Sequence, residues 1–197
     1  MSTTDSPKPL DVVVLAAGQG TRMRSKLPKI LHPLGGRSLL DHVLDTASSL
    51  APRRIHVVVG HQAEVVRGST QTPVEWVRQS EQLGTGHAVA QALPAIDDGH
   101  TVLVVFGDVP LVSADTLRDA CLAAAGDSLA LVTAQFEDPA QLGRIIRSSD
   151  GGIKAIVEYA DATDEQRQIH EINSGIMALN AELMKRLLAE VEPQNAQ

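Results

Sequence analysis

Short apolar runs rich in valine recur through the first two-thirds of the sequence, and they constrain its fold more than any other feature. Residues 11–17, 55–60 and 101–106 are such runs, and their length and β-branching favour strands that are buried on both faces. Segments with helical features separate them, such as residues 85–93, which stop before Pro94. Strands that alternate with helices predict a Rossmann-like α/β fold, with helices flanking a mixed, mainly parallel sheet.

The last third of the chain breaks this alternation. Residues 144–147 and 153–158 are predicted to be short strands on either side of Asp150-Gly151-Gly152, a strong hairpin turn. A small antiparallel insertion is therefore expected there. The remaining expected strands are residues 74–78, 129–134 and 172–179, and the remaining expected helices follow the capping residues Ser38, Ser113 and Asn180 to about residues 49, 125 and 190.

No repeat, low-complexity linker or internal boundary interrupts the sequence. We expect a disordered tail at residues 1–10, which lack the apolar core of a signal peptide, and one domain over residues 11–197. No apolar run approaches the ~20 residues that span a bilayer. The single cysteine, Cys121, excludes an internal disulfide and indicates a cytoplasmic protein. Without a basic neighbour, Cys121 is predicted to be a buried structural thiol rather than a nucleophile.

The overall charge argues against a nucleic-acid partner. The net charge is −7 and aromatic residues make up 2% of the chain, whereas nucleic-acid binding requires a broad basic surface or aromatic stacking platforms. Within this acidic chain, four basic residues nevertheless fall within one short segment: Arg22, Arg24, Lys26 and Lys29. This local cluster predicts a small, specific anion site.

A glycine loop follows the first predicted strand, where ligands bind in open α/β sheets. Gly18 and Gly20 let backbone N–H groups approach a phosphate, and Arg22 and Lys29 can neutralise its charge. A dinucleotide fingerprint would require glycine in place of Met23, and the Gly-Lys-Ser/Thr of a Walker loop is missing. Taken alone, the two glycines leave a simple turn as the alternative.

A second loop lies between a predicted strand and a predicted helix. Gln79 and Gln82 carry amides that can both donate to and accept from the edge of a base. Gly84 lets the backbone approach a flat ring, and Thr85 can cap the following helix. His87 is interpreted as a helix-packing residue rather than as a catalyst.

A lone carboxylate ends the third valine-rich run. Asp108 follows Phe106 and Gly107, and it is expected to point into the same crevice as the glycine loop. Hard oxygen ligands suit Mg²⁺, which takes one or two carboxylates together with phosphate oxygens and waters. The alternative is an ordinary turn or N-cap aspartate.

These motifs together resemble those of the sugar-phosphate nucleotidyltransferases. The start, Leu15–Met23, is common to several of these enzymes, whereas the continuation Leu27–His32 (LPKILH) resembles more particularly the bacterial bifunctional N-acetylglucosamine-1-phosphate uridylyltransferase/glucosamine-1-phosphate acetyltransferase family. The segment Gln79–Ala88 is similar to the uracil-reading loop of that family, and residues 107–110 are similar to its Gly-Asp-x-Pro metal element. The matching elements run from about Val13 to the C-terminus.

The resemblance implies a nucleotidyltransferase fold and the Mg²⁺-dependent transfer of UMP from UTP to N-acetylglucosamine-1-phosphate. The products would be pyrophosphate and UDP-N-acetylglucosamine, a precursor of the cell envelope. Arg22 and Lys29 would be catalytic, and Asp108 would hold the metal. The sugar phosphate would be bound by Gly143, Glu158 and Asn173. UTP would be bound by Leu15, Ala16, Ala17, Gly18, Gly20, Thr21, Lys29, Gln79, Gln82, Gly84, Thr85, Phe106 and Gly107.

The sequence also departs from the family. Phe106 and Leu142 stand where tyrosine is usual, and Ala160 stands where lysine is frequent, so the corresponding hydroxyl and charge contacts are not expected. The sequence ends at Gln197, ahead of the family's second metal ligand, an asparagine, and of its C-terminal acetyltransferase β-helix, through which homotrimers assemble. We therefore expect an incomplete domain. Two alternatives stay open: a weakly active or inactive fragment that binds UTP or a UDP-sugar, and a transferase for another sugar-1-phosphate or for CTP and an alcohol phosphate.

Overall fold

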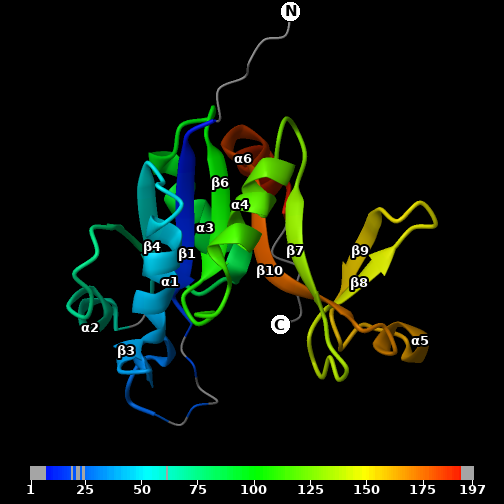
Figure 1. Ribbon diagram of the computed structural model, residues 1–197, viewed down its shortest axis with the longest axis horizontal. Helices are drawn as coiled ribbons and strands as arrows, with labels where there is room; N and C mark the ends of the chain where they lie inside the picture. The colour runs from blue at the N-terminus through cyan, green and yellow to red at the C-terminus, as the bar shows by residue number, and fades with distance from the viewer. Residues whose placement is uncertain (1–7, 19, 21–22, 24, 61, 192–197) are drawn as a thin grey trace, which may run out of the picture. The chain divides into compact units, whose positions relative to one another are not determined.

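The computed structural model describes residues 8–191, apart from residues 19, 21, 22, 24 and 61. The chain forms two compact units (Figure 1). The first comprises the chain up to Ala130 together with the part from Met177 onward, and the second comprises Leu131–Ile176. Among the described residues, none of the helices combines the length and the apolar character that a bilayer crossing requires.

A mainly parallel sheet forms the centre of the first unit. Its strands are β1 (Leu10–Ala16), β4 (Arg54–Val59), β5 (Glu75–Arg78) and β6 (Thr101–Phe106), in the order β5-β4-β1-β6, and all their pairings are parallel. The last residues of β10 (Glu171–Asn180) pair with β6 in the antiparallel direction. The predicted mixed, mainly parallel α/β sheet is therefore confirmed.

Helices cover both faces of this sheet, with α1 and α4 on the near face in Figure 1 and α3 behind it. The predicted caps are also found, since Ser38, Ser113 and Asn180 each accept a backbone N–H of the helix that follows. Pro94 ends α3 and itself lies in a short 3-10 turn. The helices of this unit are α1 (Leu39–Ser48), α2 (Ala63–Arg67), α3 (Thr85–Ala92), α4 (Ala114–Ala123) and α6 (Ala181–Glu190), and the 3-10 turns are η2 (Lys29–Leu31) and η3 (Leu93–Ala95).

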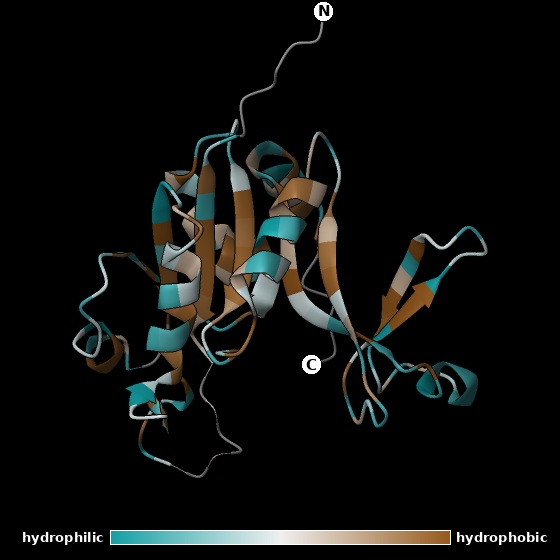
Figure 2. Cartoon of the chain, in the orientation of Figure 1, coloured by the Kyte–Doolittle hydropathy of each residue, from teal (hydrophilic) through white to brown (hydrophobic). Residues whose placement is uncertain are grey.

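The valine run in β1 shows why the strands need cover on both sides. Val12, Val13 and Val14 are each 0% exposed, although consecutive side chains of a strand point to opposite faces. Such a strand is stable only where apolar groups pack against both faces. Figure 2 shows the hydrophobic colouring concentrated on these central strands.

The second unit contains the antiparallel insertion. Strand β8 (Arg144–Arg147) pairs with β9 (Ile153–Val157) in an antiparallel hairpin. The predicted turn closes it, since Gly151 has a φ of 87° and the N–H of Ser148 donates to the carbonyl oxygen of Gly152 at 2.9 Å. The unit also holds most of β7 (Ala130–Gln135), helix α5 (Asp164–Arg167) and the first part of β10, which pairs with β8 through Ile172 and Arg144.

Several short elements were not predicted. Helices α2 and α5 span five and four residues, which is too short for a helical hydrophobic period to show in the sequence. The two-residue strands β2 (Pro33–Leu34) and β3 (Arg37–Ser38) pair as a tight hairpin. Cys121 differs from its prediction in being half-buried rather than fully buried. Burial still raises the pKa of its thiol to about 11, so it is not a ready nucleophile at neutral pH.

Candidate functional site

The loops that carry the predicted site residues in the first unit share one edge of the sheet. Strands β1, β4, β5 and β6 are parallel neighbours, so their carboxyl ends lie at the same edge. The glycine loop follows β1, Gly60 follows β4, the Gln79 loop follows β5 and Gly107 follows β6. This edge is where open α/β sheets bind ligands.

The two glycines after β1 have different roles. Gly18 is exposed, and a Cβ there would meet no atom within 4 Å. Gly20 has a φ of +59°, and a Cβ there would lie 2.7 Å from the Cβ of Lys29. Protein packing therefore requires glycine at position 20, because only the absent side chain lets the loop close over Lys29. The predicted site residues Thr21 and Arg22 lie outside the described residues.

Lys29 and Asp108 form an ion pair at this edge. The Nζ of Lys29 lies 2.5 Å from Oδ2 of Asp108, and the two side chains are 43% and 26% exposed. The neighbouring residues fix both partners. Gly107 donates its N–H to the carbonyl oxygen of Leu15 at 2.9 Å, and a Cβ on Gly107 would come within 3.3 Å of buried Ile30. The carboxylate and the ammonium are thus held together while both remain open to solvent.

The chemistry of Asp108 fits one protein ligand of a magnesium ion. It is a hard oxygen donor, and it already neutralises a cation, the Lys29 ammonium, in this structure. The described residues contain no group of three or more His, Cys, Asp or Glu side chains that could hold a metal ion. Mg²⁺ commonly takes one or two carboxylates together with phosphate oxygens and waters, and Asp108 would be one such carboxylate.

Gln79 lies beneath the second loop rather than on its surface. It is 4% exposed, and its Nε2 donates to the carbonyl oxygen of Gly84 at 3.2 Å. The same Nε2 lies 3.1 Å from Nδ1 of His87. The prediction that Thr85 caps helix α3 is wrong. The N-cap is Gly84, with a φ of 99°, and Thr85 is the first helical residue, so no side chain caps this end.

Gln82 connects the second loop to the glycine loop. Its Nε2 donates to the carbonyl oxygen of Ala17 at 2.9 Å. Gly60 makes room for this bridge, since a Cβ there would lie 3.0 Å from both the Ala17 oxygen and the Gln82 Nε2. Sequence reasoning missed Gly60, although a glycine directly after a valine-rich strand is a recognisable sign of close backbone approach.

The second unit brings together the three residues predicted to bind the sugar phosphate. The N–H of Asn173 donates to the carbonyl oxygen of Gly143 at 2.9 Å. A Cβ on Gly143 would lie 3.0 Å from Oε1 of Glu158, so the glycine lets the carboxylate pack against its backbone. The Oδ1 of Asn173 accepts from the N–H of Gly175 at 2.8 Å. The result is a cluster of the exposed Glu158 carboxylate, the half-buried Asn173 amide and the buried backbone of Gly143.

Arg144 supports this cluster from below, and sequence reasoning gave it no role. It is 2% exposed and donates to the carbonyl oxygens of Leu142 and Ala140, the latter at 2.9 Å. Its guanidinium also lies 5.6 Å from the centre of the Tyr159 ring, within the range of a cation–π contact. Arg144 thereby fixes the backbone that leads into Gly143.

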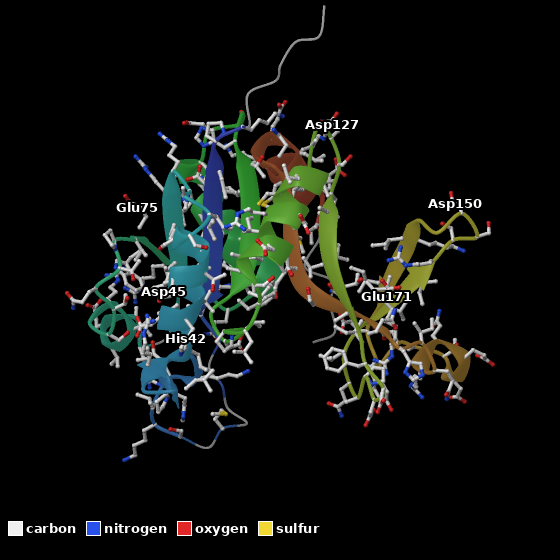
Figure 3. All side chains as sticks on the ribbon, viewed as in Figure 1. His42, Asp45, Glu75, Asp127, Asp150 and Glu171 are labelled. Carbon is white, nitrogen blue, oxygen red and sulfur yellow. The ribbon has the colours of Figure 1, made fainter. Side chains whose placement is uncertain are left out.

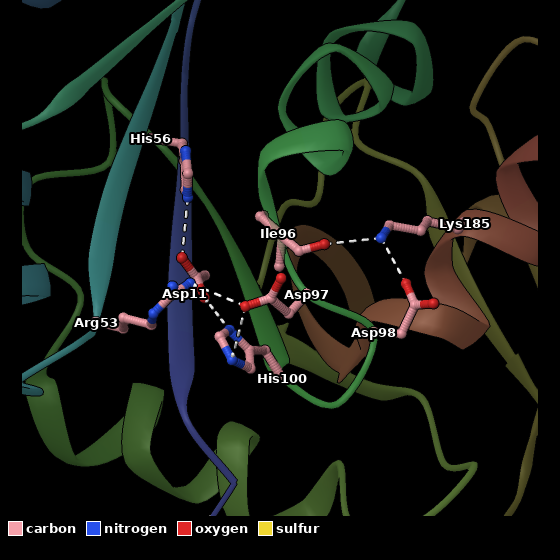
Figure 4. A network of polar contacts seen from close by, with 8 residues as sticks. All are labelled: Asp11, Arg53, His56, Ile96, Asp97, Asp98, His100 and Lys185. Atoms are coloured by element: carbon pink, nitrogen blue, oxygen red, sulfur yellow. Dashed lines mark hydrogen bonds and ion pairs between the residues drawn. The ribbon is translucent and has the colours of Figure 1, made fainter.

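A further polar network lies at the opposite edge of the first unit's sheet (Figure 4). Asp11, at the start of β1, is 0% exposed and accepts from two histidines. Its Oδ1 lies 2.9 Å from Nε2 of His56, and its Oδ2 lies 2.6 Å from Nδ1 of His100. Within the described part of the chain, Nδ1 of His56 has no partner. In the sequence both residues stand in valine-rich runs predicted to be buried strands, Asp11 at the start of one and His56 within the next.

Each unit also has a charged pair that involves none of the proposed site residues, and Figure 3 labels the acidic partners, Asp45 and Glu171. Arg37 donates to Asp45 at 2.6 Å, and this bond lowers the pKa of the Asp45 carboxyl. Arg147 binds Glu171 through two nitrogens at 2.8 and 2.6 Å, which lowers the pKa of Glu171. The Arg37–Asp45 pair is exposed on both sides, so it is expected to contribute little to stability and provides a control for the site residues.

Comparisons with known proteins agree with this arrangement. The family model described as MobA-like NTP transferase domain matches residues 12–174. A curated relative from Marinobacter nauticus, named bifunctional protein GlmU, is 52% identical over 190 residues, which cover 96% of this chain and 42% of the relative. A protein of the same name from Alkalilimnicola ehrlichii is 53% identical over 189 residues, covering 95% and 41%. The chain thus spans about 42% of the length of these relatives.

Solved structures with the same fold are more distant in sequence. UDP-glucose pyrophosphorylase complexed with UDP-glucose matches with a TM-score of 0.75 at 18% identity, over 94% of this chain and 81% of the other. HddC from Yersinia pseudotuberculosis complexed with GMP-PN matches with a TM-score of 0.69 at 22% identity, over 89% and 78%. At these identities the likeness establishes the fold.

Proposed function

Because the chain belongs to the MobA-like NTP transferase domain family, we propose that it is a nucleotidyltransferase that transfers UMP from UTP to N-acetylglucosamine-1-phosphate. The products would be UDP-N-acetylglucosamine and pyrophosphate. The observation that carries the proposal is the Lys29–Asp108 pair at 2.5 Å, held against the glycine loop through Gly20. The choice of uridine and of the acetamido sugar rests on the resemblance of Gln79–Ala88 and of the Asn173 segment to the uridylyltransferase family.

The proposed chemistry is an in-line displacement at the α-phosphorus. A phosphate oxygen of the sugar phosphate attacks, and pyrophosphate leaves on the opposite side. A phosphate monoester is already ionised near neutrality, so the protein needs neither a general base nor a covalent intermediate. Its work is to align two anions and to neutralise their repulsion. Lys29 would do this together with Arg22, which lies outside the described residues.

In this proposal Asp108 would hold Mg²⁺. The ion, when bound, would supply positive charge at the phosphate oxygens. Lys29 can exchange the Asp108 carboxylate for phosphate oxygens, because both side chains are partly exposed and their pairing is not locked in the core. The same carboxylate would keep the ammonium oriented toward the reacting phosphates until the substrate binds.

The remaining assignments follow the two clusters. Within the first unit, Gln79, Gln82, Gly84 and Thr85 would contact the base. The loop residues that would contact the triphosphate or the nucleoside are Leu15, Ala16, Ala17, Gly18, Gly20, Thr21, Phe106 and Gly107. Within the second unit, the sugar phosphate would be bound by Gly143, Glu158 and Asn173, whose carboxylate, amide and backbone groups suit sugar hydroxyl and acetamido groups.

A second candidate is binding without efficient turnover. It is favoured by the metal ligands at hand, since the described residues contain no group of three or more acidic, histidine or cysteine side chains that could hold a metal ion. A domain of this kind would hold UTP or a UDP-sugar and would gain thermal stability from the ligand by mass action.

The test is pyrophosphate release with UTP, N-acetylglucosamine-1-phosphate and Mg²⁺, run beside a thermal-shift titration. Release that requires all three components supports the proposal. A thermal shift with UTP but without release supports the second candidate. A panel of CTP, GTP, ATP and other sugar-1-phosphates decides the substrates, and preference for CTP or for another sugar would overturn the assigned pair. Absence of both signals with every nucleotide would overturn both candidates.

A further inference from the structure

A chain of polar groups runs behind the base-binding loop and into helix α3. The Nε2 of Gln79 lies 3.2 Å from the carbonyl oxygen of Gly84 and 3.1 Å from Nδ1 of His87. On the other side of the imidazole, Nε2 of Gln91 lies 3.1 Å from Nε2 of His87 and 3.3 Å from the His87 carbonyl oxygen. The proposed reaction assigns no role to His87 or Gln91. Both side chains are nevertheless part-buried, so their donors and acceptors need to be matched.

The Gly84 carbonyl determines which way the Gln79 amide faces. A carbonyl oxygen can only accept a hydrogen bond, so the Gln79 atom beside it has to be the nitrogen. The second N–H of that nitrogen is directed at Nδ1 of His87. Nδ1 must therefore carry a lone pair, because a protonated Nδ1 would set two donors against each other.

The same reasoning assigns the other side of the imidazole. A neutral histidine without a proton on Nδ1 carries it on Nε2, and that N–H requires an acceptor. In the structure Nε2 of Gln91 stands at this position and donates to the His87 carbonyl oxygen at 3.3 Å, so a protonated Nε2 of His87 would face a second donor at 3.1 Å. The proposed tautomer therefore requires the Gln91 amide to turn, so that its oxygen accepts from Nε2 of His87 and its contact with the His87 carbonyl oxygen is given up.

We propose that His87 is a specificity-determining positioning residue, whose Nδ1 lone pair locks Gln79 so that only its carbonyl oxygen is left for the base. This inference rests on the proposed function, in which Gln79 reads the nucleotide. An amide oxygen accepts the N3–H that uracil carries, whereas cytosine has a lone pair at N3. His87 thus favours uridine over cytidine without touching the nucleotide.

The prediction depends on one acceptor atom, so the effect of losing that acceptor can be distinguished from the effect of changed packing at position 87. His87→Asn retains an acceptor, Oδ1, near the place of Nδ1, and His87→Leu fills a similar volume without one. For His87→Leu we expect the ratio of kcat/KM for UTP over CTP to fall roughly tenfold, about what the loss of one well-placed hydrogen bond gives. The change is expected in KM for UTP, and kcat at saturating UTP should stay near that of the parent. His87→Asn should retain most of the preference.

A matched control is His42→Leu, which removes a histidine outside the site, bonded to the carbonyl oxygen of Leu34 at 2.8 Å. It should leave the ratio unchanged. Loss of the preference in the Leu and Asn variants of His87 alike would overturn the proposal, and so would its retention in His87→Leu.

A measurement on the unmodified chain tests whether His87 orients Gln79, independently of any activity. Nitrogen-15 chemical shifts of the His87 ring should show Nδ1 unprotonated and Nε2 protonated. A protonated Nδ1 overturns the proposed role of His87 in orienting Gln79, even if the chain transfers UMP. If the tautomer is as expected but no nucleotide binds or reacts, the failure lies with the proposed function. The orientation of Gln79 by His87 then stands as a structural property.

Discussion

The two ends of strand β1 carry polar groups of opposite character. At its start, Asp11 is 0% exposed and bonded to His56 and His100. Beyond its end, Lys29 and Asp108 are 43% and 26% exposed and are bonded mainly to each other. Both groups are ionisable clusters on the same sheet, but only the second can exchange its partners for those of a ligand.

The difference shows what makes a polar cluster available for function. A buried carboxylate is stable only while its hydrogen bonds persist, because an unmatched buried charge is costly. An exposed pair gains little from its own contact and loses little when a ligand replaces one partner. Buried polar groups at one edge therefore stabilise this fold, and exposed ones at the other edge are left to bind.

The largest expected effect is that of Lys29→Ala on turnover. Removing one charge that stabilises the transferring phosphates should lower the rate on the order of 10²–10³-fold. Stability should change by about 1 kcal/mol or less, because the pair with Asp108 is partly exposed. The measurements are pyrophosphate release and urea unfolding, with Arg37→Ala as a control for removing an exposed, paired cation. Near-normal turnover would contradict the role given to Lys29. The sequence alone predicts the same loss for Arg22→Ala.

Asp11→Ala should show the opposite profile. It leaves the His56 and His100 nitrogens without their acceptor in the core, so the free energy of unfolding should fall by about 3 kcal/mol. Turnover per folded molecule should persist, since Asp11 lies at the far edge from the site. Chemical denaturation measures the first effect, and an active-site titration of the folded fraction measures the second. Asp98→Ala is the control, because its partner Lys185 lies 2.5 Å away on the surface. If Asp11→Ala and Asp98→Ala lowered the free energy of unfolding equally, the buried carboxylate would contribute no more to stability than an exposed one, and the contrast between the two ends of β1 would be wrong.

A smaller effect is expected for Gly60→Ala. The new Cβ would lie 3.0 Å from the Ala17 oxygen and from Nε2 of Gln82, so the bridge between the two loops has to stretch. Loss of about one net hydrogen bond, about 1 kcal/mol, predicts roughly fivefold weaker UTP binding. Calorimetric titration with UTP measures it. Gly99→Ala is the matched control, since a Cβ there meets no atom within 4 Å. If both variants bind UTP equally well, the bridge has no part in nucleotide binding.

The sequence was sufficient for those features that depend on local pattern. Valine-rich runs predicted the strands, and Ser38, Ser113 and Asn180 predicted helix starts that the structure confirms. The loops of the candidate site could be placed at one edge because parallel strands bring their carboxyl ends together.

Features that depend on distant contacts could not be predicted. The acceptor of the His56 and His100 nitrogens is Asp11, which is 45 and 89 positions away along the chain. Asp11 itself stands at the start of an apolar run. The sequence pattern does not show whether such an aspartate is paired in the core or simply marks the start of the strand. Gly60 and Arg144 act through neighbours brought close by folding, and the N-cap position expected for Thr85 is taken by Gly84.

The smallest expected effect belongs to Asp97→Asn, at the same edge as Asp11. Asp97 is 71% exposed and lies 3.3 Å from Arg53 and 3.6 Å from Nε2 of His100 (Figure 4). An exposed pair of this kind contributes about 0–1 kcal/mol, so unfolding should change within that range. A loss comparable to that of Asp11→Ala would mean that the network extends to its solvent-exposed rim. In that case burial alone would not separate the two ends of β1, and the stability of this edge would depend on the whole set of charges around His100.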